Sequence, residues 1–218
     1  MSTASDESRR QVVEVCRALD AAGMMPNKSG NVSCRTVAGF LVTPSGVPYA
    51  EVTPALLVEL PLDAVREPAK GPRPSSEWRM HRAIYQARPG VEAIVHTHSP
   101  RATALACAGQ GLPAFHYMIA LAGGDVRCMP YATFGTDELA GHALRGLEGR
   151  RAVLLANHGV VTVGTSPRRA MAVAVEVENM AGQYLDLLAA GLPPRVLGEE
   201  EMAAVLAKFE DYGRVERK

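Results

Sequence analysis

The 218-residue sequence has no net charge, because 23 lysines and arginines balance 23 aspartates and glutamates. This balance gives no support for a nucleic-acid-binding surface or for attachment to an acidic membrane. The polar N-terminal segment 1–10 lacks an apolar signal core, and no later stretch is long enough to span a bilayer. We therefore expect a cytoplasmic protein with no nucleic-acid partner and no membrane partner.

The sequence also has few cysteines, and it has no segment that would divide it into separate domains. Its four cysteines, Cys16, Cys34, Cys107 and Cys128, have no close pairing. We expect reduced, mostly buried thiols and no disulfide framework. Without repeats or low-complexity linkers, and with 47% hydrophobic and 21% charged residues, the composition predicts one globular domain over residues 1–218.

Hydrophobic periodicity predicts strands that alternate with helices. A first helix with its apolar face at 12, 15, 16 and 19 should end before Gly23. The other expected helices start near 75, 100, 136, 167 and 199. The expected strands lie at 32–35, 40–43, 56–60, 91–97, near 126, and at 152–156 and 160–163, the last two as a hairpin. This alternation predicts an α/β sandwich in which helices flank a central sheet.

Three of the six histidines stand at the ends of apolar runs. His96 and His98 are two residues apart, so in an extended chain their side chains point to the same side. Such a pair alone is more often a surface or hydrogen-bonded pair than a metal site. His158, at the end of the expected strand 152–156, supplies a third imidazole. Three imidazoles with an open fourth position are typical of a catalytic zinc site.

Glu77 is the candidate for a fourth ligand or for an acid/base group beside these histidines. It follows two serines at the start of a helical pattern, so we expect it in the first turn of that helix. A carboxylate at this position also has an ordinary structural explanation, because it stabilises a helix N-terminus through capping or the helix dipole. The residues alone leave both interpretations open.

Three short segments are rich in groups that bind oxyanions, namely 27–31, 43–46 and 75–76. Serine hydroxyls, glycine backbone and the unpaired N–H groups of a helix start all suit a phosphate. Each segment by itself is also an ordinary turn or cap. Their occurrence together with a possible metal triad favours a phosphate-binding site.

Motifs along nearly the whole chain resemble the class II aldolase/adducin family. They are Gly-Asn-Val-Ser at 30–33, Thr-Pro-Ser-Gly-Val-Pro-Tyr at 43–49, Pro-Ser-Ser-Glu-Trp-Arg at 74–79, Val-His-Thr-His at 95–98, His-Tyr-Met-Ile at 116–119, Pro-Tyr-Ala-Thr-Phe-Gly-Thr at 130–136 and Lys-Phe-Glu-Asp-Tyr-Gly at 208–213. The resemblance implies a central, mainly antiparallel sheet flanked by helices in a three-layer sandwich. It also implies a cyclic (C4) homotetramer with active sites at the subunit boundaries.

The resemblance assigns roles to individual residues. His96, His98 and His158 would bind Zn²⁺, with Co²⁺ or Mn²⁺ as alternatives, and Glu77 would be a further ligand that can leave to act as acid/base. Tyr117, reaching in from the neighbouring subunit, would exchange the proton at the oxygen on substrate carbon 4. The residues implied to contact the phosphate or the rest of the substrate are Gly30, Asn31, Ser45, Gly46, Ser75, Ser76, Phe134 and Tyr212.

Two positions depart from the family pattern. Lys28 stands where enzymes of this family that cleave fuculose phosphate have a threonine near the phosphate. It would add a positive charge to the phosphate site, or it would lie in solvent. Asn157 stands where such enzymes have a histidine before the ligand histidine.

The implied activity is reversible, metal-dependent cleavage of a ketose 1-phosphate, of the L-fuculose 1-phosphate type, to dihydroxyacetone phosphate and a small aldehyde. The same catalytic residues would serve 5-deoxyribulose 1-phosphate or 5-methylthioribulose 1-phosphate. A methylthioribulose-phosphate dehydratase and a pentulose-phosphate 4-epimerase fit less well, the latter because that branch has aspartate where Glu77 stands. Adducin head domains share the fold without chemistry, but the three histidines and Glu77 favour an enzyme.

Overall fold

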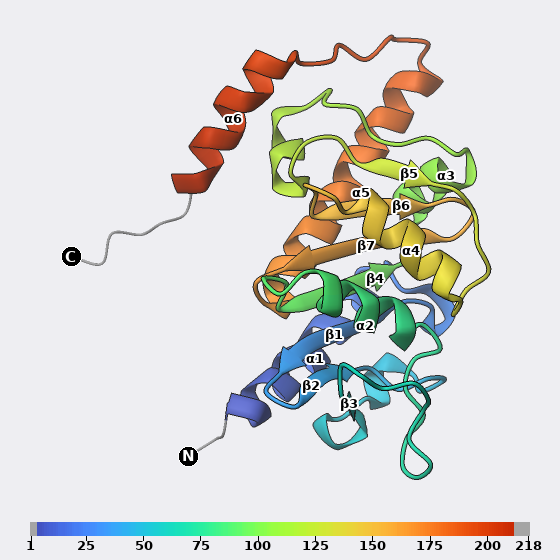
Figure 1. Cartoon of the computed structure of the whole chain (residues 1–218). Coiled ribbons are helices and arrows are strands. Elements are labelled where there is room, and N and C mark those ends of the chain that lie inside the picture. Colours follow the sequence, from blue (N-terminus) through green and yellow to red (C-terminus); the bar gives the residue numbers. More distant parts are fainter. Residues whose placement is uncertain (1–3, 212–218) are drawn as a thin grey trace.

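A sheet of seven strands forms the centre of this computed structural model, which describes residues 4–211 (Figure 1). The strands are β1 Asn31–Thr36, β2 Gly39–Val42, β3 Val58–Leu60, β4 Ala93–Thr97, β5 Arg127–Met129, β6 Ala152–Leu155 and β7 Gly159–Gly164. Their order across the sheet is β3-β2-β1-β4-β7-β6-β5, and every neighbouring pair is antiparallel except the parallel pair β5–β6. The predicted, mainly antiparallel central sheet is therefore confirmed.

The register of the central strands gathers segments that are far apart in the sequence. Asn31, the first residue of β1, lies opposite His96 near the end of β4. On the other side of β4, His96 lies opposite Val161 of β7. The start of β1, the end of β4 and the β6–β7 turn thus meet at one end of the sheet.

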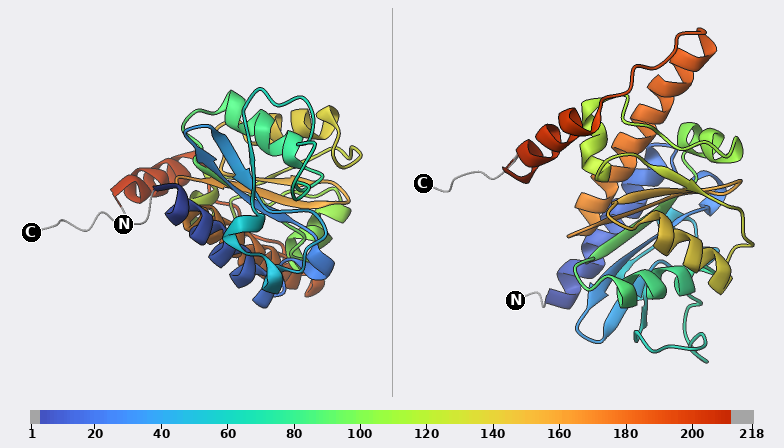
Figure 2. Two further views of the ribbon diagram at one scale, coloured as in Figure 1. Left: turned by 90° about the horizontal axis from the view of Figure 1, so that it is seen from below. Right: turned by 45° about the horizontal axis from the view of Figure 1, so that its top comes forward.

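Helices cover both faces of the sheet (Figures 1 and 2). They are α1 Ala4–Ala21, α2 Trp78–Ala87, α3 Pro100–Cys107, α4 Asp137–Gly146, α5 Pro167–Ala189 and α6 Glu199–Asp211, with short 3-10 helices η1 Pro26–Lys28, η2 Tyr49–Glu51, η3 Pro54–Leu56 and η4 Tyr117–Ala122. α2 and α4 pack together on one face, and α1, α3 and α5 lie on the other. α6 extends beyond the sheet and contacts η4.

Side chains of β4 alternate between the two faces, as the two-residue period of a strand requires. Ile94 packs in the apolar core under α2 and α4, together with Trp78 and Phe40. Val95 packs in the core under α1 and α5. His96 follows Ile94 by two residues, so its side chain is directed to the α2 face. The strand pattern thus decides which helix lies beside the histidines.

Local sequence signals explain most helix boundaries. Thr136 caps α4 by accepting a hydrogen bond from the Leu139 N–H at 3.2 Å, and Ser166 caps α5 in the same way through the Arg169 N–H at 3.2 Å. Such caps satisfy backbone donors that a helix start leaves unpaired. These boundaries agree with the predicted helices. Over residues 4–211 no helix is long and apolar enough to cross a membrane.

Two details of the sequence-based prediction are wrong. Glu77 is not in the first turn of a helix, because α2 begins at Trp78 and Glu77 is the residue before it, with a non-helical ψ of 12°. Ser75 tightens the chain here, since its carbonyl accepts from the Trp78 N–H at 3.1 Å. The cysteines are all free, but only Cys16 and Cys34 are buried, while Cys107 is exposed at the end of α3.

Candidate active site

Three imidazoles converge where β4 and the β6–β7 turn meet. His96 lies within β4, His98 follows the end of that strand, and His158 lies in the turn before β7. One nitrogen from each imidazole lies within 4.8 Å of the others, a spacing at which they could hold one metal ion. The sequence-predicted triad is therefore brought together. Gly159 permits this approach, because a Cβ there would lie 2.4 Å from the Thr97 carbonyl oxygen and 3.1 Å from the His98 ring.

A backbone carbonyl fixes the tautomer of His96. Its Nδ1 lies 2.9 Å from the Val160 carbonyl oxygen, which can only accept, so Nδ1 carries the proton and donates. Nε2 is then the nitrogen that carries the lone pair whenever the ring is neutral, and it lies 3.0 Å from His98 Nε2. Metal-binding histidines are commonly oriented by such a hydrogen bond from the other ring nitrogen.

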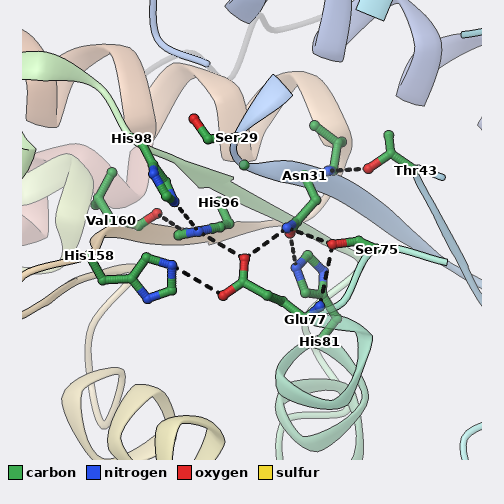
Figure 3. A network of polar contacts seen from close by, with 12 residues as sticks. Ser29, Asn31, Thr43, Ser75, Glu77, His81, His96, His98, His158 and Val160 are labelled. Atoms are coloured by element: carbon green, nitrogen blue, oxygen red, sulfur yellow. Dashed lines mark hydrogen bonds and ion pairs between the residues drawn. The ribbon is translucent and has the colours of Figure 1, made fainter. Parts of the chain in front are cut away.

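The Glu77 carboxylate lies between these imidazoles (Figure 3). One oxygen, Oε2, is 3.0 Å from His96 Nε2, and the other, Oε1, is 3.3 Å from His158 Nε2. Glu77 makes no side-chain cap to α2, so the capping explanation for this carboxylate is excluded. Glu77 is only 5% exposed. Its carboxylate is therefore buried, and its contacts are with the histidines and Asn31.

Protonation in this cluster is set by burial and by the charge of Glu77. Burial would raise the pKa of the Glu77 carboxyl, but His96, His158 and the Asn31 hydrogen bond outweigh it and hold that pKa well below its ordinary value. Burial lowers the pKa of His98 to about 3 and that of His158 to about 4, with the charge on His96 adding to both effects. Burial also opposes charge on His96, yet Glu77 raises its pKa.

The donor set of the cluster fits a divalent cation. Near neutral pH the low pKa values leave His98 and His158 as neutral rings that offer lone pairs, and Glu77 is ionised. Glu77 Oε1 is buried and accepts no hydrogen bond from any residue that the structure describes. Buried acceptors that face one another are unfavourable unless a cation lies between them. Nitrogen and carboxylate ligands of this kind suit zinc and neighbouring transition metals.

A cavity of about 310 Å³ opens from this cluster. Its lining includes Glu77, His98 and His158 and all the predicted substrate residues that lie in the described part of the chain, namely Lys28, Gly30, Asn31, Ser45, Gly46, Ser75, Ser76 and Phe134. This volume lies in the range of small-molecule sites, which is about 300–1,000 Å³. The three oxyanion-binding segments recognised in the sequence thus surround one space next to the histidines.

Backbone pairing joins two of these segments. Pro44 and Pro74 form an isolated antiparallel bridge, and the flanking hydrogen bonds run from Ser45 N–H to the Arg73 carbonyl at 2.9 Å and from Ser75 N–H to the Thr43 carbonyl at 3.0 Å. Gly46, next in the turn, has a φ of 75° that favours glycine. The bridge therefore holds the 43–46 turn against the chain that leads into α2.

Lys28 lies at the mouth of the cavity and is exposed. Its backbone is in the left-handed region, with φ of 63°. The Tyr49 hydroxyl is within hydrogen-bonding distance of the Lys28, Ser29 and Gly30 carbonyl oxygens, the shortest at 2.6 Å to Gly30. These contacts fix the course of the loop, so the backbone of Lys28 stays beside the predicted phosphate residues.

Tyr117, predicted to act across a subunit boundary, and Tyr212, predicted to contact the substrate, differ in what the structure describes. Tyr117 does not line the cavity. It lies at the start of η4, 53% exposed, where its ring contacts His116 and Phe209 with centroid distances of 4.9 and 6.4 Å. Its role in a neighbouring subunit stays a prediction. Tyr212 lies outside the described residues.

Several residues at the site were not singled out for it from the sequence. Tyr131 lines the cavity and is 59% exposed; its position within the 130–136 motif was the available signal. Asn157 lines the cavity with a φ of 56°, a conformation that asparagine adopts more readily than histidine, which gives its departure from the family pattern a local reason. His81, on α2, lies behind Asn31, and no sequence pattern pointed to it.

Comparison with known proteins agrees with this geometry. Residues 10–185 match the family model described as "Class II Aldolase and Adducin N-terminal domain". A 5-methylthioribulose-1-phosphate/5-deoxyribulose-1-phosphate aldolase of Rhodospirillum rubrum is 46% identical, over 94% of this chain and 92% of its own length. An L-fuculose phosphate aldolase of Escherichia coli K12 is 43% identical, over 94% of each chain.

A solved structure of an L-fuculose 1-phosphate aldolase superposes with a TM-score of 0.89 at 38% identity, covering 96% of this chain and 98% of that one. These relatives are enzymes, and the metal-binding histidine geometry is present here, so the non-catalytic adducin alternative is not supported. The chain belongs to the class II aldolase and adducin family and is one of its metal-dependent aldolases, a lyase.

Proposed function

We propose that this protein is a zinc-dependent aldolase that reversibly cleaves a ketose 1-phosphate of the L-fuculose 1-phosphate type to dihydroxyacetone phosphate and a small aldehyde. The observation that carries the proposal is the Glu77 carboxylate, 3.0 and 3.3 Å from two of three converging imidazoles at the inner end of a cavity lined by phosphate-binding groups. An acid/base group, a cation site and an oxyanion site in one space are the parts that this reaction requires.

His96, His98 and His158 would hold the zinc, with Glu77 as a further ligand. Cobalt or manganese would also fit these nitrogen and carboxylate donors. A metal bound here would stabilise the negative charge that develops when the bond between carbons 3 and 4 of the ketose breaks. No lysine is needed to form a Schiff base, because the charge is stabilised by the cation.

Proton transfers are assigned to two residues. When the bond between carbons 3 and 4 breaks, the electron pair stays on carbon 3, and Glu77 would deliver the proton that this carbon takes up. In the reverse direction Glu77 would remove that proton from dihydroxyacetone phosphate. The hydroxyl on carbon 4 loses its proton as the aldehyde forms, and we assign this exchange to Tyr117 of a neighbouring subunit.

The phosphate would lie at the outer end of the cavity, among Gly30, Ser45, Gly46 and Ser76, with the Ser75 hydroxyl and the Lys28 ammonium group beside it. Support comes from the paired turns at 43–46 and 73–76 and from Ser75 and Ser76, which line the cavity just before α2 begins. Asn31 lines the cavity, but its amide is already engaged with Glu77 and Ser75 at 3.0 and 2.9 Å. Phe134, which is 64% exposed at the rim, would contact the aldehyde end of the substrate.

We further propose a cyclic (C4) homotetramer of cytoplasmic single-domain subunits spanning residues 1–218. The position of Tyr117 supports a shared site, because it is exposed, does not line its own cavity and contacts Phe209 of α6. Sedimentation at several protein concentrations would test the assembly state. A monomer with full activity would exclude a shared site.

A second substrate class is favoured by one comparison. The 46% identical relative from R. rubrum is named for 5-methylthioribulose 1-phosphate and 5-deoxyribulose 1-phosphate. Both ketoses have the same phosphate end and the same functional groups on carbons 1 to 4 as L-fuculose 1-phosphate. They differ from it in the group at the far end of the aldehyde product. The exposed aromatic rings of Tyr131 and Phe134 at the rim suit a small apolar end.

A coupled assay for release of dihydroxyacetone phosphate tests both classes. Zinc-, cobalt- and manganese-loaded protein would be compared on the three ketose 1-phosphates by kcat/KM. Release from any of them supports the aldolase, and the ratio of kcat/KM values identifies the substrate class. Substrate loss without release would indicate a dehydratase, and no consumption would contradict this proposal.

A further inference from the structure

A chain of buried polar groups runs from the core under α2 to the Glu77 carboxylate. The Tyr85 hydroxyl is 2.7 Å from Ser33 Oγ, Ser33 Oγ is 2.6 Å from His81 Nδ1, and His81 Nε2 is 2.5 Å from Asn31 Oδ1. Asn31 Nδ2 then lies 3.0 Å from Glu77 Oε2. All five residues are at most 5% exposed. Figure 3 shows the Asn31 amide linked by dashed lines to Glu77, Ser75 and His81.

The direction of every hydrogen bond in this chain follows from Glu77. An ionised carboxylate can only accept, so Asn31 must present its NH₂ group to Glu77 and its carbonyl oxygen to His81. His81 must then donate from Nε2. His81 is fully buried and its ring nitrogens face only the uncharged side chains of Asn31 and Ser33, so the ring is neutral and Nδ1 is an acceptor. Ser33 therefore donates to Nδ1 and accepts from the Tyr85 hydroxyl.

The opposite arrangement would put two acceptors in contact. If Asn31 were turned over, its carbonyl oxygen would face Glu77 Oε2 at 3.0 Å and Ser75 Oγ at 2.9 Å. In the observed orientation both amide hydrogens are used, one on Glu77 and one on the Ser75 hydroxyl. Unpaired buried acceptors are destabilising, so the Glu77 carboxylate and the donor on His81 together select one of the two amide orientations.

We infer that His81 is a positioning residue, whose Nε2–H holds the Asn31 amide so that its nitrogen orients the Glu77 carboxylate beside the metal-binding histidines. The inference rests on the proposed acid/base role of Glu77. His81 touches neither the cavity nor the three histidines, and it acts through Asn31. Its contribution is geometric: a carboxylate displaced by about 1 Å from its working position can lose about 10²-fold in rate.

Two substitutions at His81 form a matched pair. In His81→Gln the longer side chain places an amide N–H near the former Nε2 and can donate to Asn31. In His81→Asn the shorter side chain reaches only the Ser33 side, as Nδ1 does. Both keep a buried amide in the core, so they differ chiefly in whether Asn31 receives a donor.

Exchange of solvent deuterium into dihydroxyacetone phosphate, followed by NMR with zinc-loaded protein, measures proton removal by Glu77. No bond between carbons 3 and 4 is made or broken in this assay. We expect His81→Asn to lower kcat for exchange by about 10²-fold, with KM and zinc content unchanged, and His81→Gln to recover most of the rate. Equal losses in both variants, or a loss expressed mainly in KM, would overturn the positioning role.

A second measurement does not depend on activity. Nitrogen-15 NMR of the wild-type imidazoles should show His81 as the neutral Nε2–H tautomer, in the zinc-loaded protein, across the pH range in which the fold is stable. A proton on Nδ1 would overturn the inference. If the wild-type protein exchanges no deuterium although the tautomer is as expected, the proposed function fails while the orientation of Asn31 stands.

Thr162→Val is the control for loss of a buried hydrogen bond elsewhere. Thr162 is fully buried and donates to the Ala170 carbonyl at 2.9 Å, on the α5 face of the sheet. This variant should exchange at close to the wild-type rate. If it lost as much rate as His81→Asn at equal thermal stability, the effect would be a general response of the core, and the inference would be wrong.

Discussion

The two ends of the cavity are built in different ways. At the inner end, buried side chains from strand ends meet: His96 is 0% and Glu77 5% exposed, and both are held by hydrogen bonds to neighbouring strands or helices. At the outer end, Ser45, Gly46 and Ser76 lie on exposed turns, and the paired backbone of two loops shapes the site.

This difference separates chemistry from recognition. Charge stabilisation and proton transfer need particular side chains at fixed positions, and the buried strands supply that rigidity. A phosphate can be bound by backbone N–H groups and hydroxyls of several kinds, so exposed turns are sufficient. Substitutions at the inner end should therefore act on the metal and on kcat, and substitutions at the outer end on KM.

The largest effect should come from His98→Ala. Removing one of three imidazoles should lower zinc retention and with it detectable cleavage, because the ion loses a strong nitrogen ligand and only His96, His158 and Glu77 are left to hold it. His98 lies after β4 and is partly exposed, so the fold should persist. Metal analysis after dialysis, with circular dichroism as a check on folding, measures both.

His142→Gln is the matched control, since His142 lies on α4 and bonds to the Pro130 carbonyl, away from the triad. It should keep one zinc per subunit. Stoichiometric zinc in His98→Ala would contradict the assignment of that imidazole as a ligand.

Glu77→Gln should separate metal binding from chemistry at the same inner end. The amide has the size of the carboxylate but cannot accept the substrate proton, so we expect zinc to be retained and kcat to fall by about 10²- to 10⁴-fold. Steady-state cleavage and metal content are the two measurements. Cleavage at the wild-type rate would mean that another group is the base.

The sequence predicted the inner end well because its chemistry needs rare residue types. Three histidines at strand ends and a carboxylate after two serines are recognisable, and the antiparallel register brings Asn31 and His96 face to face. The features that the sequence did not predict depend on pairing between distant segments of the chain. The pairing of Pro44 with Pro74 and the position of His81 behind Asn31 join residues tens of positions apart, for which local patterns carry no signal.

Local patterns also misplaced small features for physical reasons. The serines before Glu77 predicted a helix that starts near residue 75 and includes Glu77, but the chain forms a turn closed by the Ser75 carbonyl and α2 begins only at Trp78. Glu77 is therefore the N-cap residue of α2, but its side chain makes no cap and contacts the imidazoles of His96 and His158 instead. The four cysteines were expected to be mostly buried from their residue type, whereas Cys107 is exposed at the end of α3.

Tyr117 belongs to neither end of the cavity within one chain, so its substitution tests whether a second subunit completes the site. Tyr117→Phe keeps the ring and removes the hydroxyl. We expect cleavage of the bond between carbons 3 and 4 to slow by about 10²-fold, because the oxygen on carbon 4 loses its proton acceptor, while deuterium exchange into dihydroxyacetone phosphate changes little. Equal slowing of both reactions would reassign the hydroxyl to substrate positioning.

The smallest effect should come from Lys28→Thr, which restores the residue that the family pattern has at the outer end. Lys28 is exposed, so loss of its attraction for phosphate should raise KM only about two- to fivefold, with kcat unchanged. High salt should remove the difference, because exposed charges are screened. Lys70→Thr, which removes an exposed lysine that does not line the cavity, is the control and should leave KM unchanged. An unchanged KM in Lys28→Thr at low salt would place this ammonium group in solvent and leave phosphate binding to the turns alone.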